Sequence, residues 1–237
     1  MEKLKIRIKI ISEIIKVIIP SIIFNLRYLP FKQAIRVPIL INKGHLYNTD
    51  GKIIIDAPIK FGMIRLGFFG GHMYPDNGIH WTQYGGTIIF KGKCIIGNNS
   101  FIVQGKDSTL IFGDDFLAST SLKIISFKHV EFGNHTRMGW EVLVLDTNFH
   151  PLYDIKKEKF KRAYGPIKIG NNNWFATQCK IMNSVTTPDF CIFGMGTIVN
   201  RGGEFESYCV HGGSPVRILS HDVMRIIGQD TISSYKD

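Results

Sequence analysis

The chain has 237 residues, of which 44% are hydrophobic, so it holds enough apolar material for a substantial core. Lysine and arginine exceed aspartate and glutamate by 10 (29 against 19), which favours an anionic partner such as a nucleic acid, a lipid surface or a phosphorylated small molecule. The sequence shows no zinc-finger spacing, ribonucleoprotein aromatic motif or basic tail, which argues against nucleic acid.

Residues 1–49 are predicted to form an N-terminal helical and extended segment. Isoleucines recur in pairs every four residues between Ile10 and Ile23, which predicts a helix with one apolar face, although the alternating residues 5–10 also fit a strand. No signal-peptide cleavage site follows, and the apolar run is too short and too charged to span a bilayer. Two roles remain open: packing on the fold or between subunits, or resting on an anionic membrane surface.

A six-residue rhythm follows, after a faint beginning between residues 50 and 84. Apolar residues keep this spacing in short runs, and the phase changes between runs, which marks bulges or small insertions. The positions are Phe90, Ile96, Ile102, Phe112, Ala118, Ile124, Phe132, Met138 and Val144.

The repeat is clearest in residues 169–204. The first position of each block is large and apolar in five of six blocks: Ile169, Phe175, Ile181, Thr187, Phe193 and Val199. The fifth position is small or medium: Asn173, Cys179, Val185, Cys191, Thr197 and Gly203. A period of six fits neither a helix nor a simple strand and is typical of a parallel β-helix. We predict one mainly-β solenoid of roughly eight coils over residues 50–219 and a C-terminal tail, residues 220–237, that is a candidate helix.

All four cysteines occupy the fifth position of their blocks, so they are interpreted as core fillers. Cys191 and Cys209 are expected on adjacent coils, where strands lie about 4.8 Å apart, so distance allows a disulfide. A reduced cytosolic pair is the favoured interpretation. A zinc site is not expected, because the sequence has no Cys-x-x-Cys pair.

Four segments resemble a known family. They are the repeat of residues 169–200, MGWEVLVLDTNFHP (138–151), VHGGSPVRIL (210–219) and FNLRYLPFKQAIRVPILI (24–41). Together they resemble the bacterial hexapeptide-repeat acyltransferases of the polysaccharide or lipopolysaccharide O-acetyltransferase type, from about Asn25 to Leu219. The resemblance implies a left-handed parallel β-helix, a homotrimer, and acyl transfer from acetyl-CoA to a sugar without a metal.

His150 matches the histidine of the family's Asp-x-x-x-His active-site segment. It precedes a polar excursion, residues 151–166, that has no six-residue register and is expected to loop out, where functional residues concentrate. Imidazole is well suited to take a proton from a sugar hydroxyl near neutral pH.

Asp146 is expected either to hold the tautomer of His150 or to cap the end of the strand. Asn148 and Trp140 are expected to contact the acceptor, and Trp140 fits a core position equally well.

For the donor, the resemblance implies a groove between neighbouring solenoids. Exposed backbone at Ala176, Gly194 and Thr197 would pair with the pantetheine amides, and Trp174 would flank the groove. Cations would face the CoA phosphates, where a positive field is favourable. These cations are Arg217 with Lys180 or Arg201.

The remaining histidines give weaker signals. His129 and His135 are expected at equivalent outward corners, where a metal would lack a third ligand in register. His72 and His80 lie in an irregular segment that either lines an acceptor cleft or closes a loop. His211 falls at an inward position and marks the end of the regular coils.

We therefore expect an acetyl-CoA-dependent O-acetyltransferase acting on a sugar hydroxyl of a surface glycan (capsule, lipopolysaccharide or O-antigen) or its precursor, by direct transfer with His150 as general base. Two alternatives remain: an N-acyltransferase acting on an amino-sugar nucleotide, and a non-catalytic solenoid that scaffolds glycan assembly. The expected location is cytoplasmic, with the N-terminus as a candidate peripheral contact to the inner face of the cytoplasmic membrane.

Overall fold

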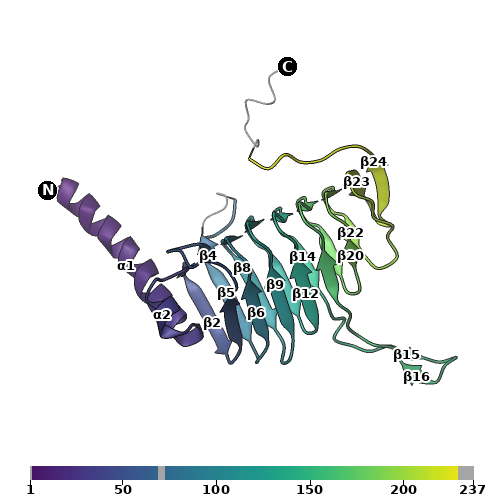
Figure 1. Ribbon diagram of the computed structural model, residues 1–237, viewed down its shortest axis with the longest axis horizontal. Helices are drawn as coiled ribbons and strands as arrows, with labels where there is room; N and C mark the ends of the chain where they lie inside the picture. The colour runs from purple at the N-terminus through teal and green to yellow at the C-terminus, as the bar shows by residue number, and fades with distance from the viewer. Residues whose placement is uncertain (1, 69–72, 229–237) are drawn as a thin grey trace, which may run out of the picture.

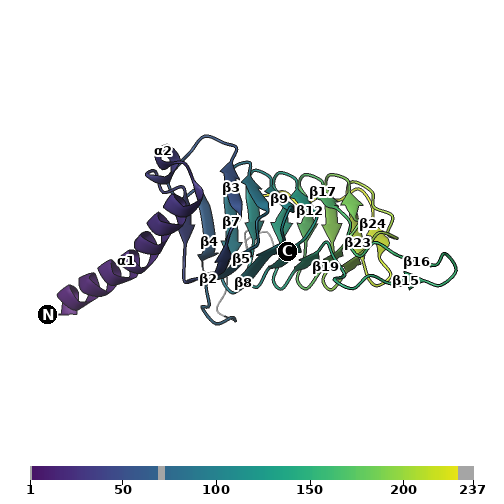
Figure 2. The same ribbon diagram turned by 90° about the horizontal axis from the view of Figure 1, so that it is seen from below.

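The computed structural model describes residues 2–68 and 73–228, with side chains from residue 12 onward. It shows short parallel strands that wind around one axis and stack into three sheets, preceded by a long helix (Figure 1, Figure 2). The predicted mainly-β parallel helix is confirmed. His72, predicted to lie near a cleft or a loop closure, is outside the described residues.

Each complete coil contributes one strand to each sheet. Sheet A contains, in order, β1 (Ile39–Ile41), β4 (Ile64–Phe68), β7 (Cys94–Gly97), β10 (Phe116–Ala118), β13 (Arg137–Met138), β18 (Trp174–Phe175), β21 (Cys191–Phe193), β23 (Cys209–Gly212) and β24 (Arg217–Ser220). Sheet B contains β2 (Gly44–Thr49), β5 (Ile79–Gln83), β8 (Ser100–Gln104), β11 (Lys123–Ser126), β14 (Leu143–Leu145), β19 (Lys180–Met182) and β22 (Ile198–Val199). Sheet C contains β3 (Lys52–Ile55), β6 (Thr87–Phe90), β9 (Thr109–Phe112), β12 (His129–Phe132), β17 (Ile167–Ile169) and β20 (Thr186–Thr187). The remaining elements are α1 (Glu2–Tyr28), α2 (Phe31–Ala34), and the hairpin strands β15 (Tyr153–Asp154) and β16 (Lys159–Phe160).

Within the described chain, six coils supply all three strands and a seventh supplies β21 and β22. β23 begins an eighth turn and then pairs with β24 in antiparallel fashion, which ends the parallel stack. The first coil begins at Ile39, so the boundary predicted at residue 50 is too late. β2 hides this coil in the sequence, because it carries a bulge between Leu46 and Asn48 and most of its side chains are exposed.

Inward positions of successive coils stack into columns of similar side chains. Phe90, Phe112 and Phe132 occupy equivalent positions, with neighbouring ring centroids 5.2 and 5.6 Å apart. Phe175 and Phe193 stack in the same way at 4.5 Å. All four cysteines are buried and free, in agreement with their interpretation as reduced core fillers. The six-residue register of the sequence is therefore the register of the core.

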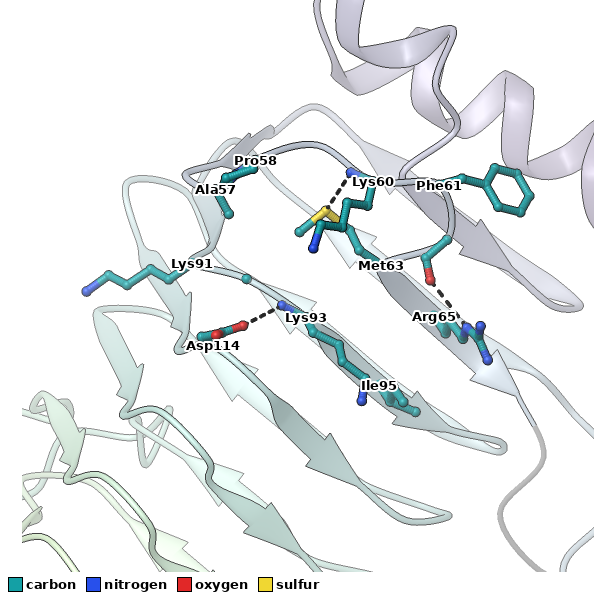
Figure 3. A pocket seen from close by; sticks show the side chains of 12 residues that line it. Ala57, Pro58, Lys60, Phe61, Met63, Arg65, Lys91, Lys93, Ile95 and Asp114 are labelled. Carbon is teal, nitrogen blue, oxygen red and sulfur yellow. Dashed lines mark hydrogen bonds between the residues drawn. The ribbon is translucent and has the colours of Figure 1, made fainter. Parts of the chain in front are cut away.

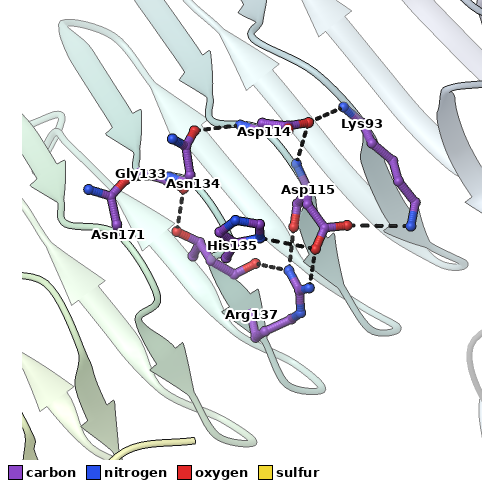
Figure 4. A network of polar contacts seen from close by, with 9 residues as sticks. Lys93, Asp114, Asp115, Gly133, Asn134, His135, Arg137 and Asn171 are labelled. Carbon is purple, nitrogen blue, oxygen red and sulfur yellow. Dashed lines mark hydrogen bonds and ion pairs between the residues drawn. The ribbon is translucent and has the colours of Figure 1, made fainter. Parts of the chain in front are cut away.

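Asparagine and aspartate side chains join successive coils at the corner between sheets C and A. Oδ1 of Asp114 accepts the backbone N–H of Lys93 at 2.8 Å, and Oδ1 of Asn134 accepts that of Asp114 at 2.8 Å. Asn171 continues the ladder by accepting the N–H of Asn134 at 2.8 Å (Figure 4). These side chains satisfy backbone donors where the chain turns, so the corner keeps the coils in step.

The last two turns of α1 close the N-terminal end of the solenoid. Ile39 donates its N–H to Oδ1 of Asn25 at 3.2 Å, and its carbonyl oxygen accepts from Nδ2 of Asn25 at 2.7 Å. Oγ of Ser21 accepts the N–H of Ile41 at 2.9 Å, and Phe24 is buried beside them. β1 is the edge strand of sheet A, so α1 covers backbone groups that would otherwise template pairing with another chain.

The N-terminal half of α1 extends away from the solenoid (Figure 1, Figure 2). Ile14, Ile15 and Ile19, which precede the contacts at Ser21, are each about half exposed. Residues 5–10 belong to the helix, so a strand there is excluded. In the part of the chain that the structure describes, no helix is long and apolar enough to cross a membrane.

Two segments leave the regular path of the coils. The predicted excursion of residues 151–166 separates β14 from β17 and forms a projecting hairpin from β15 and β16 (Figure 1). Residues 221–228, beyond β24, contain no helix, in contrast to the helix considered for the tail. This C-terminal segment passes sheet A, where the Arg225 guanidinium lies 4.5 Å from the ring centroid of Trp174.

Replacement of Cys191 by arginine tests the core register. Cys191 is fully buried, and its Sγ lies 3.3 Å from the carbonyl oxygen of Glu206, so an arginine would bury its charge in a filled space. We expect the free energy of unfolding to fall by more than about 4 kcal/mol in urea denaturation. The control Thr186→Arg, at an exposed position of β20, should unfold like the parent. Parental stability of Cys191→Arg would show that the register is misassigned.

Candidate functional site

His150 stands at the corner between sheets B and C, on the turn that follows β14. Phe149 donates its N–H to Oγ1 of Thr147 at 3.0 Å, and His150 donates its N–H to the carbonyl oxygen of Asn148 at 2.6 Å. Phe149 has a left-handed backbone (φ 57°), and its ring packs edge-on against Phe127. The turn thereby exposes the His150 side chain to an incoming ligand.

A cleft of about 500 Å³ opens beside His150, between the hairpin and the outer face of sheet B. Four cations and three asparagines line it, and none of its lining residues is acidic. The cations are Lys161, Arg162, Lys180 and Arg201, and the asparagines are Asn148, Asn183 and Asn200. Such a surface, with a base, amides and positive charge, suits a hydroxyl-bearing ligand that carries negative charge.

The base of the hairpin is tied to the end of β14. Asn148 donates its N–H to the carbonyl oxygen of Ala163 at 2.6 Å, and Gly165 donates to that of Asp146 at 2.9 Å. Nδ2 of Asn183 donates to Oδ1 of Asn148 at 2.7 Å. Asn148 therefore lies in the cleft with His150, which fits its predicted contact with the acceptor.

The Asp146 side chain contacts the preceding coil. Its buried carboxylate accepts the backbone N–H groups of Phe127, Lys128 and His129 at 2.7–2.9 Å. Burial raises the pKa of Asp146, although these hydrogen bonds act to lower it. The capping role is the one the structure shows, and it acts on the end of β11. Among the described residues, no hydrogen bond to the His150 imidazole is present, so the tautomer-holding role of Asp146 stays a prediction without a contact that supports it.

Trp140 lies at a different corner, between sheets A and B, and Trp174 lies beside it on β18 of sheet A. They line a pocket of about 230 Å³ together with Ala176. Trp140 is 37% exposed, so it is not a core residue. β14 separates Trp140 from His150, and the predicted acceptor pair of Trp140 and Asn148 is therefore not brought together within one chain.

The backbone N–H groups expected to meet a pantetheine arm are used inside the solenoid. Ala176 donates to the carbonyl oxygen of Phe193 at 2.8 Å, and Gly194 donates to that of His211 at 2.8 Å. Thr197 donates its N–H to the carbonyl oxygen of Gly194 at 3.3 Å. The three residues lie along one corner of the last coils, which agrees with a groove at that corner. Their N–H groups, however, already donate hydrogen bonds within the chain and are not available to a pantetheine arm.

The cations expected to face CoA phosphates do not form one group. Lys180 and Arg201 line the His150 cleft, whereas Arg217 lies on β24 at the end of sheet A, outside both pockets. Sequence reasoning missed Lys161 and Arg162, although the basic run within the excursion was an available signal.

His80 and His211 take no part in the cleft. The His80 ring stacks between those of His45 and Phe101 on the outer face of sheet B, with centroids 4.5 and 4.2 Å away. His211 is fully buried, as its inward position predicts, and burial lowers its pKa. Each of the two rings stacks on aromatic side chains of adjacent coils.

His135 belongs to an ion-pair network (Figure 4). Its Nδ1 lies 3.3 Å from Oδ2 of Asp115, which also pairs with Arg137 and with Lys93. Burial acts to raise the pKa of Asp115, but hydrogen bonds from Arg137 and His135 hold it below the usual value. His129 pairs instead with Glu131 on its own strand, so the two histidines share no ligand set.

A larger cleft of about 570 Å³ lies on the first coils (Figure 3). Lys60, Arg65, Lys91 and Lys93 line it, and its acid, Asp114, already accepts the N–H of Lys93. No histidine is among its lining residues. The His150 cleft is therefore the better candidate for proton transfer, although it is smaller.

Asp146→Asn separates the two roles predicted for this side chain. The substitution replaces one carboxylate oxygen with an amide NH₂ group, which cannot accept hydrogen bonds from the backbone N–H groups of residues 127–129. We therefore expect the free energy of unfolding to fall by about 2–3 kcal/mol in urea denaturation. The exposed Asp107→Asn serves as control and should leave stability unchanged. Parental stability combined with an altered His150 titration in NMR would restore the orienting role.

No protein-family profile matches the chain. In sequence, it is similar to the galactoside O-acetyltransferase of Escherichia coli K12, with 28% identity over 112 residues. That match covers 47% of this chain and 54% of the other protein, so it spans about half the length of this relative.

In structure, the chain is similar to the polySia-specific acetyltransferase NeuO, with a TM-score of 0.52 and 22% identity over 81% of this chain and 88% of that one. The polysialic acid O-acetyltransferase OatWY gives a TM-score of 0.41 and 15% identity over 81% and 93% of the two chains. The predicted resemblance is thus confirmed: the chain has the left-handed parallel β-helix fold of the hexapeptide-repeat acetyltransferases.

Proposed function

We propose that the protein is an acetyl-CoA-dependent O-acetyltransferase that acts on a sugar hydroxyl of a surface glycan (capsule, lipopolysaccharide or O-antigen) or its precursor. The observation that carries this proposal is the cleft at His150, where an exposed imidazole stands among four cations without an acidic neighbour in the lining. The names of the similar proteins support the reaction type, since they describe acetyl transfer to a galactoside and to polysialic acid.

In the proposed reaction, His150 takes the proton of the sugar hydroxyl as the hydroxyl oxygen attacks the thioester carbonyl carbon of acetyl-CoA. The C–S bond breaks, and the imidazolium returns the proton to the departing thiolate. The products are a sugar O-acetyl ester and free CoA, with His150 in its starting state. Because no described side chain hydrogen-bonds the imidazole, the ligand or a neighbouring chain supplies its orientation.

The cations of the cleft suit an acidic acceptor better than the phosphates of CoA. With the thioester beside His150, the pantetheine arm holds the phosphates away from this cleft. Lys180 and Arg201 share the cleft with His150. We therefore assign them to carboxylate or phosphate groups of the glycan, in place of the CoA phosphates expected from the sequence.

The proposed site needs two chains. Trp174 on sheet A and Ala176 at the corner between sheets A and B line one pocket, whereas His150 lies at the corner between sheets B and C. A donor that runs along Trp174 therefore does not meet His150 of the same chain. We propose that, in a homotrimer, the B–C corner of one subunit faces the A–B corner of the next, so that closed symmetry completes three equal sites.

His150→Ala tests the base. We expect kcat to fall by about 10²–10⁴ with an acidic oligosaccharide acceptor, because proton transfer is lost, while the Kd for CoA stays unchanged by calorimetry. His129→Ala, on the outer face of sheet C, is the matched control and should keep parental kcat. An amino-sugar nucleotide assayed in parallel distinguishes N-acetyl transfer. Turnover of His150→Ala within a few-fold of the parent would remove His150 from the mechanism.

Co-expression of two inactive variants tests the shared site. His150→Ala removes the base, and Ala176→Trp fills the groove at the other corner. Randomly mixed trimers should regain about one quarter of parental activity, because about a quarter of the sites pair an intact base with an intact groove of the neighbour. Mixtures no more active than either variant alone would place both parts of the site in one chain.

We also propose that the N-terminal half of α1 rests on the anionic inner face of the cytoplasmic membrane. Ile14, Ile15 and Ile19 present an exposed apolar face. Lys16 lies between Ile15 and Ile19 in the sequence, which adds four cations before residue 10. Apolar insertion and attraction to anionic headgroups reinforce each other on such a helix.

The variant Ile14→Gln/Ile15→Gln/Ile19→Gln tests this contact and leaves Ser21 and Asn25, which cap β1, in place. The parent should co-sediment with anionic phospholipid vesicles at low salt and be released as salt rises, because screening weakens surface attraction. The variant should stay in the supernatant with parental Tm. Ile155→Gln, at the exposed hairpin, controls for general loss of apolar surface. If the parent binds no vesicles and the variant has a lower Tm, the isoleucine face packs between subunits and not on a membrane.

A further inference from the structure

A thiol, an imidazole and a carboxylate converge where the last coil meets the C-terminal segment. Sγ of Cys209 lies 3.3 Å from Nδ1 of His221, and this nitrogen lies 4.0 Å from Oε2 of Glu206. The three atoms all lie within 4.8 Å of one another. They come from the loop before β23, from β23 itself and from the residue after β24, so only the folded chain brings them together.

These separations fit a zinc ion. In a tetrahedral site with bonds of about 2.0–2.3 Å, the ligand atoms lie roughly 3.4–3.6 Å apart. The distance between Cys209 Sγ and His221 Nδ1 already has nearly this value. The side chains of His221 and Glu206 are 62% and 61% exposed, so the carboxylate has room to approach Nδ1 by the remaining distance of about 0.5 Å.

The surroundings also suit a cation. Cys209 is 2% exposed, so a metal–thiolate bond would be shielded from solvent. The carboxylate of Asp222 adds negative charge near the thiol, beside that of Glu206. One sulfur, one nitrogen and one oxygen ligand form a donor set that zinc accepts, with water in the fourth position.

We propose that Cys209, His221 and Glu206 bind one Zn²⁺, independently of acetyl transfer. The ion fastens residues 221–228 to the last coil, which this segment already meets through the N–H of Val223 and the carbonyl oxygen of Tyr208 at 2.9 Å. The spacing is Glu-x₂-Cys-x₁₁-His. The expectation that zinc is absent rested on the missing Cys-x-x-Cys pair, a pattern that this site does not use.

The full chain, purified without a metal-affinity tag, provides the first test. After equilibration with Zn²⁺ and gel filtration, it should retain about one zinc per chain by atomic emission. Replacement by Co²⁺ should give the charge-transfer absorption of a cobalt–thiolate bond, and chelation should lower the Tm. Loss of all zinc on gel filtration would overturn the proposal.

Matched variants assign the ligands. His221→Gln alters an exposed side chain, so it should fold and yet lose the zinc, whereas His135→Gln, at another partly exposed histidine, should keep it. Cys209→Ala and Cys94→Ala each remove a buried thiol, and only the first should abolish the cobalt–thiolate band. Undiminished zinc in His221→Gln would also overturn the proposal, even if Cys209→Ala failed to fold.

Discussion

The parallel register that repeats from coil to coil is the constraint on which the rest of the molecule depends. Ile124, Val144 and Ile181 follow one another in a single inward column of sheet B. A residue inserted within a strand would turn every later side chain of that strand to the opposite face. Extra chain is therefore accommodated at corners, and the hairpin leaves at the corner after β14. The same rule places His150 on the surface beside that hairpin.

The fold can be predicted from the sequence where the coils are short and regular. Between Ile169 and Val199 the spacing alone locates the inward residues, because each side and corner has a constant length. The first coil escapes prediction, since the bulge in β2 breaks the spacing while the strand pairing persists. The cap at the N-terminal end cannot be predicted for a related reason: Ser21 and Asn25 act through contacts with β1 that no repeat encodes.

The candidate site is predictable only in its local part. The motif and the loss of register after it locate His150 and Asn148. The direction of Asp146 cannot be read from its spacing to His150, because its partners lie on the preceding coil. Lys180 and Arg201 likewise reach the cleft through the stacking of later coils. Contacts between coils join residues about twenty positions apart. A motif of a few residues contains no information on such contacts.

The base and the donor groove are proposed to belong to neighbouring chains, since sheet B separates them within one chain. A crystal structure of the protein with CoA tests this most directly. We expect CoA between two subunits, with its sulfur beside His150 of one and its pantetheine arm along Trp174 and Ala176 of the next. CoA bound wholly to one chain, with its sulfur beyond hydrogen-bonding reach of any His150, would contradict this arrangement.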